Sequence, residues 1–183
     1  IVFGDWSSDV CSSDLTAVIG LLFHQISDLL FSSVGLVGVT LIVTGILLWG
    51  TRRINAHGRG IPGFTGSNAF AIGVVQGLAI LPGISRSGST IAAGLYLGLE
   101  RGVAARFSFL LSIPAIIGAQ LLGLKDLGPS LPPVHATLMG TLTAFIVGYF
   151  SLAMLMYVVN RGRIYLFAPY CWLLGGIALA VGW

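Results

Sequence analysis

The chain has 183 residues, of which 56% are hydrophobic and only 8% are charged. An ordinary soluble domain carries about 25% charged residues, so the composition excludes a water-covered surface and indicates a protein that lies mostly in lipid. The mean hydropathy of +0.97 agrees. The net charge of +3 is small and dispersed, which excludes the basic patch that nucleic acid binding needs. The two cysteines, Cys11 and Cys171, lie in unlike segments and indicate no disulfide framework.

Residues 1–15 differ from the rest of the chain. They hold half of the acidic residues, at Asp5, Asp9 and Asp14, and they repeat Ser-Ser-Asp. A signal peptide would have a basic start and an apolar centre, and this stretch has neither. We interpret it as a non-native or artefactual leader, with a short exposed tail as the alternative. Residues 16–183 then form one transmembrane domain.

Apolar segments of membrane-spanning length follow in chain order. Residues 16–23 resemble the end of a span, and about 20 apolar residues are needed for a complete crossing. Complete spans are expected at 33–50, 107–124, 134–159 and 164–183. The sequence therefore predicts an all-α, polytopic transmembrane helix bundle.

Residues 68–99 show a different pattern, with two short apolar pieces, 69–81 and 89–99, on either side of a polar centre. Neither piece is long enough to cross a bilayer, and Pro82-Gly83 would break a continuous helix. We predict a re-entrant hairpin of two half-helices, the second beginning near Ser87. A broken backbone at membrane depth is tolerated where it is buried in protein or lines a cavity, so the hairpin should line a cavity.

The basic residues provide an independent test of this topology. If 68–99 enters and leaves on one side, three loops share that side and carry Arg52, Arg53, Arg59, Arg101, Arg106, Arg161 and Arg163. Lys125 alone falls on the other side. The positive-inside rule then predicts a cytoplasmic position for the arginine-rich loops.

The polar centre of the hairpin carries the candidate site. Arg86 is flanked by apolar helices, so we expect it inside the bundle, where a charge costs about 2.5–3.5 kcal/mol on insertion scales. Since few acidic residues are available, an anionic ligand is the simplest partner. The alternative is an Arg86 that joins helices by bonding backbone carbonyls.

The neighbouring residue types favour a phosphate. Hydroxyl donors surround Arg86, glycines let backbone N–H groups approach a ligand, and the start of the second half-helix directs its dipole into the turn. Arginine adds a bidentate fork for phosphate oxygens. The predicted catalytic residues are Arg86, Ser85 and Ser87. The predicted phosphate-binding residues are Gly83, Ser85, Arg86, Ser87, Gly88, Ser89, Thr90 and Gln76.

Gln76, on the first half-helix, leaves an alternative open, because it could bind the ligand or only join two helices. No histidine or cysteine spacing indicates a transition-metal site, so we predict no metal-binding residue.

Residues 76–90, QGLAILPGISRSGST, resemble the bacterial undecaprenyl-diphosphate phosphatases, the bacitracin-resistance family. The resemblance continues through Gly94, Gly98, Arg101 and residues 106–114, RFSFLLSIP, and it includes residues 16–23, TAVIGLLF. It implies hydrolysis of undecaprenyl diphosphate to undecaprenyl phosphate and inorganic phosphate in the bacterial plasma membrane. That reaction recycles the lipid carrier of peptidoglycan synthesis and confers bacitracin resistance.

The resemblance also implies two inverted repeats, each with a re-entrant hairpin, that meet at an active-site cavity facing outward. It further implies dependence on a divalent cation, Mg²⁺ or Ca²⁺. The family's first half carries a Glu-rich motif and a segment with serine and histidine, and neither is visible here. We therefore expect this chain to be the C-terminal part of such an enzyme and to be nearly inactive alone. The expected partners are a polyprenyl diphosphate lipid, the membrane and, as one assembly, a second copy of the chain.

Two other functions remain open. A lipid-phosphate flippase or anion transporter would suit the same hairpin, because broken helices are common in transporters. A purely structural membrane subunit would leave Arg86 without a partner.

Overall fold

Helices make up the part of the chain that the structure, a computed structural model, describes: residues 33–54, 58, 60, 64–123 and 133–182. Residues 1–15 and 16–23 lie outside this part. No strand occurs in the described part, and the predicted all-α fold is confirmed. In chain order the elements are α3 (Val34–Gly50), η1 (Thr51–Arg53), α4 (Gly66–Leu78), α5 (Arg86–Tyr96), α6 (Arg101–Gly123), α7 (Val134–Asn160), η4 (Ile164–Phe167) and α8 (Ala168–Val181).

Four helical segments are long and apolar enough to cross a membrane, and they match the predicted spans: Val34–Arg53, Arg101–Gly118, Val134–Asn160 and Ile164–Val181. The chain is therefore a multi-pass membrane protein. The helix predicted at 107–124 begins earlier, at Arg101. Hydropathy alone could not locate this start, because a helix can extend beyond the apolar run into water, where its residues need not be apolar.

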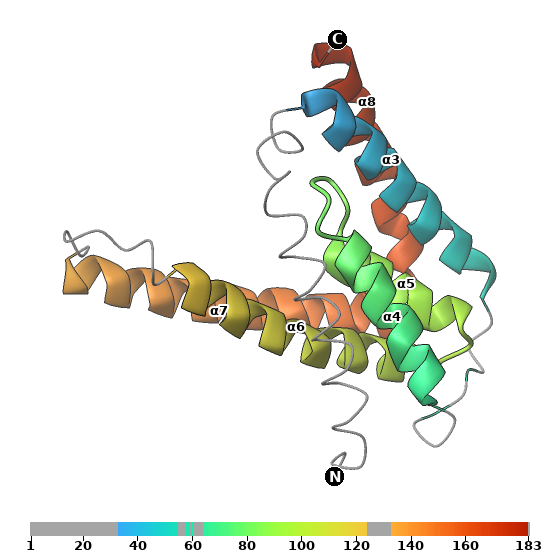
Figure 1. Ribbon diagram of the computed structural model, residues 1–183, viewed down its shortest axis with the longest axis horizontal. Coiled ribbons are helices and arrows are strands. Elements are labelled where there is room, and N and C mark those ends of the chain that lie inside the picture. The colour runs from blue at the N-terminus through green and yellow to red at the C-terminus, as the bar shows by residue number, and fades with distance from the viewer. Residues whose placement is uncertain (1–32, 55–57, 59, 61–63, 124–132, 183) are drawn as a thin grey trace.

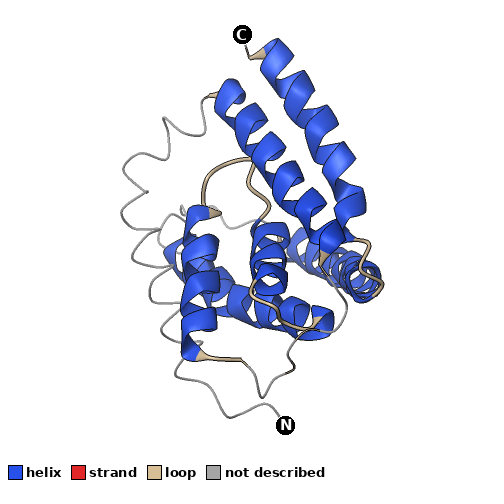
Figure 2. Cartoon of the chain, turned by 90° about the vertical axis from the view of Figure 1, so that its right-hand side faces the viewer, coloured by secondary structure: helices blue, strands red, loops and turns tan. Residues whose placement is uncertain are grey.

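Helices α3 and α8 run side by side in opposite directions (Figures 1 and 2). Glycines make this close approach possible. A Cβ atom on Gly38 would lie 2.9 Å from the Gly175 carbonyl oxygen, and one on Gly175 would lie 2.9 Å from the Gly38 carbonyl oxygen. Small residues of this kind let transmembrane backbones pack closely.

Replacing Gly175 by valine should destabilise the protein by about 2 kcal/mol, because the new side chain would overpack the contact with α3. Thermal unfolding in detergent, followed by circular dichroism, measures this loss. Gly176→Val is the matched control, since no atom lies within 4 Å of a Cβ at Gly176. Equal unfolding temperatures for the two variants would contradict the proposed contact.

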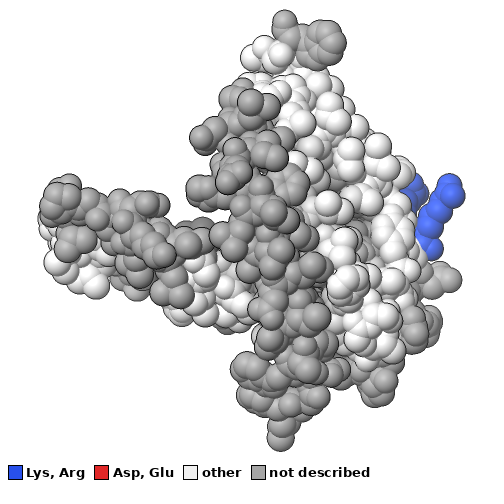
Figure 3. All heavy atoms as spheres, in the orientation of Figure 1, with Lys and Arg blue, Asp and Glu red and all other residues white. Residues whose placement is uncertain are grey.

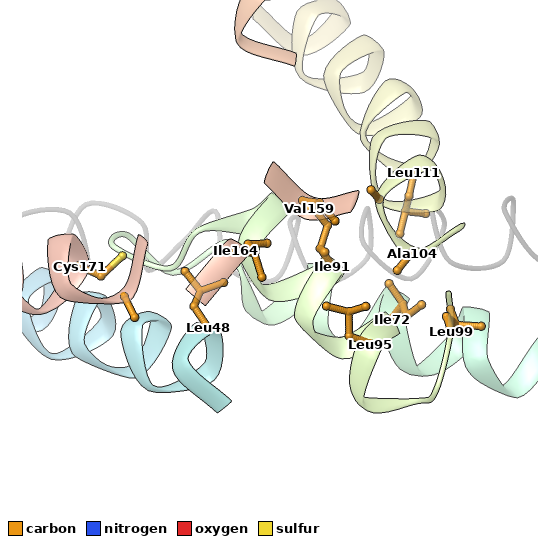
Figure 4. Packing of buried hydrophobic residues seen from close by; sticks show 12 residues of the cluster. Leu48, Ile72, Ile91, Leu95, Leu99, Ala104, Leu111, Val159, Ile164 and Cys171 are labelled. Atoms are coloured by element: carbon orange, nitrogen blue, oxygen red, sulfur yellow. The ribbon is translucent and has the colours of Figure 1, made fainter. Parts of the chain in front are cut away.

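Helices α4 and α5 form the predicted hairpin and are short, with 13 and 11 residues. Helix α4 ends at Leu78 and α5 at Tyr96, each three residues before the end of the predicted apolar piece, 69–81 or 89–99. Ser85 explains the earlier start of α5, because its side chain caps the helix. The hairpin packs its apolar face against α6 and the end of α7, in the cluster of buried side chains shown in Figure 4.

The core of the described helices is one apolar cluster between the hairpin and its neighbours (Figure 4). Ile72 of α4 and Ile91 of α5 meet Leu111 of α6 there, and Val159 brings in the end of α7. These side chains are almost completely buried. The hairpin is therefore fixed on one side by ordinary apolar packing.

The tip of the hairpin lies about halfway along α3. The far end of α5 is beside the C-terminal end of α3, because the Tyr96 hydroxyl donates to the Leu47 carbonyl oxygen at 3.0 Å. The tip instead contacts Thr40, ten positions before the last residue of α3. At about 1.5 Å per residue, Thr40 lies about 15 Å from Gly50 along the helix axis. The hairpin therefore turns back beside the middle of a helix that is long and apolar enough to cross a membrane.

Three connections meet at the end of the molecule opposite the tip. Arg101 donates from Nη2 to the Ile54 carbonyl oxygen at 3.4 Å, and its guanidinium packs against Gly162. The Arg52 guanidinium lies 5.3 Å from the centre of the Trp49 ring. Basic side chains gather at one edge of the face shown in Figure 3. The membrane side predicted for the seven arginines stays a prediction, and Arg59 and Lys125 lie outside the described residues.

Helices α6 and α7 pack against each other and extend away from the other helices (Figure 1). Nearly all of α7 is exposed, with only 6% of its span buried. Lipid can cover such an apolar helix without any loss of hydrophobic free energy, because lipid tails are as apolar as leucine. The described helices therefore form a less compact bundle than the sequence predicts.

Candidate functional site

The turn between α4 and α5 is held by two threonine hydroxyls of α3. Thr40 Oγ1 donates to the Pro82 carbonyl oxygen at 2.5 Å. Thr44 Oγ1 lies 3.4 Å from the Gly83 carbonyl oxygen and accepts from the Ser85 N–H at 3.4 Å. Both threonines are buried. The polar backbone of a turn at membrane depth is thereby paired within the protein, as a non-aqueous environment requires.

Sequence reasoning missed these two residues. They appear in a span that is otherwise apolar, and their spacing of four places both hydroxyls on one face of a helix. This spacing is the signal that could have identified them.

Gly83 faces α3 and adopts a backbone conformation that suits glycine, with φ of +91°. A Cβ atom there would lie 2.7 Å from the Val37 carbonyl oxygen and would collide with Thr40 Oγ1. Gly83 therefore serves the contact between the turn and α3. The predicted close approach of its backbone to a ligand is left untested.

In the first turn of α5, some N–H groups form hydrogen bonds with Ser85 and others form none with the described residues. Ser85 Oγ accepts from the Gly88 N–H at 3.2 Å, and the Ser89 N–H donates to the Ser85 carbonyl oxygen at 2.8 Å. The N–H groups of Arg86 and Ser87 form no hydrogen bond with the described residues. Unpaired N–H groups at a helix start, together with the helix dipole, favour an anion.

The Arg86 side chain is exposed in this chain, and the prediction that it lies inside the bundle is wrong for the described helices. Helix α3 covers the carbonyl side of the turn, while Arg86 begins α5 on a side that the described helices leave open. The Arg86 side chain and the two open N–H groups belong to the same first turn of α5. An exposed cation that follows a turn beside the middle of a membrane-spanning helix requires an anionic or polar partner.

Other predicted site residues join helices. Thr90 Oγ1 lies 2.5 Å from Ser108 Oγ of α6 and donates to the Arg86 carbonyl oxygen at 2.8 Å. Gln76 Nε2 donates to the Leu111 carbonyl oxygen at 3.3 Å, so this side chain connects α4 with α6. Sequence reasoning did not identify Ser108. These contacts orient the hairpin on α6.

Removing the Thr90 hydroxyl while keeping its shape, in Thr90→Val, should lower stability by about 1 kcal/mol. The substitution leaves the buried Ser108 hydroxyl without its partner. Chemical or thermal unfolding in detergent measures the effect. Thr143→Val is the control, since its hydroxyl bonds the Met139 carbonyl oxygen of its own exposed helix. A Thr90→Val protein as stable as this control would contradict the role of the hydroxyl pair.

The remaining predicted residues lie around the same turn. Gly88 is buried, and a Cβ there would lie 2.9 Å from Ser85 Oγ. Ser89 is buried, and its hydroxyl forms no hydrogen bond with described residues. Ser87 is half-buried and lies next to Arg86. Arg86 and Ser87 thus offer the most accessible donors of the predicted set.

The described residues do not fit a divalent cation. They contain no group of three His, Cys, Asp or Glu side chains that could hold a metal ion. Glu100 is the one carboxylate residue among them, and it is exposed before the start of α6. Mg²⁺ and Ca²⁺ require several oxygen ligands, so no chemical step through a cation is derived from these residues.

Comparison with known proteins identifies the family of the chain. A family model described as "Bacitracin resistance protein BacA" matches residues 10–177. The chain is 57% identical to a protein named undecaprenyl-diphosphatase from Desulfosudis oleivorans, over 94% of this chain and 63% of that protein. It is 50% identical to one of the same name from Desulfatibacillum aliphaticivorans, over 90% of this chain and 60% of that protein.

The chain spans about three fifths of the length of these two relatives. Relatives of similar length also exist. A protein named undecaprenyl-diphosphatase from Methanothermobacter thermautotrophicus is 46% identical, over 88% of this chain and 91% of that protein.

Proposed function

We propose the following function for this chain, which belongs to the family of the bacitracin resistance protein BacA. Its hairpin binds the diphosphate group of undecaprenyl diphosphate, a lipid that the whole enzyme hydrolyses to undecaprenyl phosphate and inorganic phosphate. The names of the relatives support this substrate. The reaction would return the lipid carrier to peptidoglycan synthesis and confer resistance to bacitracin.

The observation that carries the proposal is the position of Arg86 at the tip of the hairpin. Arg86 is exposed and begins α5 directly after a turn that α3 holds near its middle. Its own N–H and that of Ser87 form no hydrogen bond with described residues. A charged side chain inside a membrane raises the free energy of the protein, and a phosphate anion at the same depth offsets this increase. A lipid diphosphate does so, because its isoprenoid chain stays in the hydrocarbon.

The described residues suggest how the diphosphate would be held. Arg86 would bind two phosphate oxygens through its fork, and the N–H groups of Arg86 and Ser87 would bind a third. The hydroxyls of Ser85 and Ser87 could donate to the same group. Neutralising the phosphate charge is the main protein contribution to phosphoryl transfer, which also needs a positioned nucleophile or water.

No base lies next to Arg86 among the described residues, since the nearest described carboxylate is Glu100 at the other end of the hairpin. We therefore expect the chain alone to bind the diphosphate weakly and to release little phosphate. The test is phosphate release from undecaprenyl diphosphate by the purified chain in detergent, beside a relative of full length. Release at equal rates would overturn this expectation.

The arginine-rich end would face the cytoplasm by the positive-inside rule, and the hairpin would open toward the outer face of a bacterial plasma membrane. Labelling of Arg163→Cys from each side of intact cells would test this orientation. A homodimer also stays a prediction, which the mass of the chain in nanodiscs would decide.

Transport of a lipid phosphate is the second candidate. Half-helices that begin at mid-membrane are common in transporters, and the start of α5 fits this pattern. Movement of a labelled lipid diphosphate across sealed vesicles without phosphate release would favour transport over hydrolysis.

A further inference from the structure

The threonines of α3 differ from those of α7 in what their hydroxyls bond. In α7, Thr141 Oγ1 donates to the Thr137 carbonyl oxygen at 2.8 Å, within its own helix. This is the usual arrangement for a threonine inside a helix. Thr40 and Thr44 also lie near carbonyls of their own helix, at 3.0 Å, but both reach the hairpin turn as well.

We infer that Thr40 and Thr44 are positioning residues for the phosphate site: their hydroxyls set the depth and rotation of the hairpin turn. The inference rests on the proposed function, because it concerns the same site. Neither side chain is placed to touch the ligand. Both act through the backbone of the turn.

The carbonyl groups of the turn face α3. The Pro82 and Gly83 carbonyl oxygens carry partial negative charge and point toward the Thr40 and Thr44 hydroxyls. A phosphate would be repelled by these oxygens if they faced the site. With both turned toward α3, the side of Arg86 presents mainly donors.

Thr44 also contacts the start of α5, because its Oγ1 accepts from the Ser85 N–H at 3.4 Å. Ser85 caps α5 and accepts from the Gly88 N–H, so its position decides where the helix begins. Because Arg86 and Ser87 follow directly, their open N–H groups are oriented by the same contact. A rotation of Ser85 would redirect them.

The two hydroxyls also fix the position of the turn along α3. Without the hydroxyls, two carbonyl groups beside the middle of an apolar span would lack these partners, and an unpaired backbone group in such surroundings is costly. The turn would then move toward water or rotate until its carbonyls found other partners. Either change would separate the donors at the start of α5 from a lipid phosphate.

The experiment measures binding of farnesyl diphosphate to the purified chain in nanodiscs by isothermal titration. Thr40→Val/Thr44→Val keeps the shape of both side chains and removes both hydroxyls, and it should bind about tenfold more weakly. Thr40→Ser/Thr44→Ser keeps the hydroxyls and should bind within about twofold of the unmodified chain. Thr141→Val is the matched control and should also bind as the unmodified chain does.

A second measurement reports the turn without any ligand. A spin label at Ile84→Cys, with Cys11 and Cys171 replaced by serine, gives the depth of the tip by its relaxation with oxygen and with a water-soluble nickel complex. In Thr40→Val/Thr44→Val the label should lie closer to water than in the unmodified protein or in the serine variant. An unchanged depth together with unchanged binding, in a protein of unchanged helix content, overturns the inference.

Failure of the proposed function would look different. Equal binding of farnesyl diphosphate by the unmodified chain and by Arg86→Gln, or no binding by either, overturns the phosphate site itself. The depth measurement then still decides whether the two threonines position the turn. Loss of binding in Arg86→Gln alone, with full binding in the valine variant, overturns only the positioning role.

Discussion

Replacing Arg86 by glutamine should weaken the binding of an isoprenoid diphosphate by about 100-fold, which corresponds to about 3 kcal/mol. The substitution removes the exposed cation at the tip of the hairpin but leaves the capped start of α5 in place. Arg86→Lys keeps the charge and loses the bidentate fork, so it should retain part of the affinity, at a loss of about tenfold. Isothermal titration with farnesyl diphosphate measures both.

The control for this prediction is Arg53→Gln, which changes the net charge equally at the opposite end of α3. Arg53 is exposed and distant from the turn along the helix. Its substitution should leave the affinity within about twofold of the unmodified protein, because exposed charges separated by more than about 10 Å are largely screened at 0.1 M salt. Equal losses in Arg86→Gln and Arg53→Gln would show that only overall charge matters.

Replacing Gly83 by alanine should destabilise the protein by about 2–4 kcal/mol. The φ of +91° disfavours any residue with a Cβ atom, and that atom would also overlap Thr40 Oγ1 and approach the Val37 carbonyl oxygen to 2.7 Å. Since backbone lies on one side of the clash, side-chain movement cannot relieve it fully. Thermal unfolding in detergent measures the loss of stability.

Gly140→Ala is the control for Gly83→Ala, since no atom lies within 4 Å of a Cβ at Gly140 and the residue lies inside helix α7. Alanine favours a helix more than glycine does, so this variant should be neutral or slightly more stable. A Gly83→Ala protein that unfolds at the same temperature as Gly140→Ala would mean that the turn does not pack on α3 as described.

The spans and the hairpin were predictable because hydropathy and helix breaking are local properties. A run of apolar residues such as 33–50 has few alternatives in lipid, and Pro82-Gly83 interrupts a helix in almost any surroundings. Helix boundaries were less predictable. The start of α5 depends on which residue caps it, and Ser85 and Ser87 were both suitable by type.

Which polar residues of the hairpin contact another helix, and which lie on its open face, was not predictable from the sequence. Ser87 and Thr90 have similar chemistry, yet Thr90 pairs with Ser108 while Ser87 lies beside the open face. Which hydroxyl meets another helix depends on the rotation of α5 against α6. That rotation is set by apolar packing around residues such as Ile91 and Leu111.

A multi-pass helical membrane protein, the position of its broken segment and, through residues 76–90, its family all follow from the order of residues along the chain. That α3 supplies the hydroxyls that hold the turn, and that Arg86 is left exposed, follows from how the helices pack. The difference arises because hydrophobicity acts on each segment separately. Hydrogen bonds between Thr40 and Pro82 instead require two segments far apart in the chain to meet at one depth.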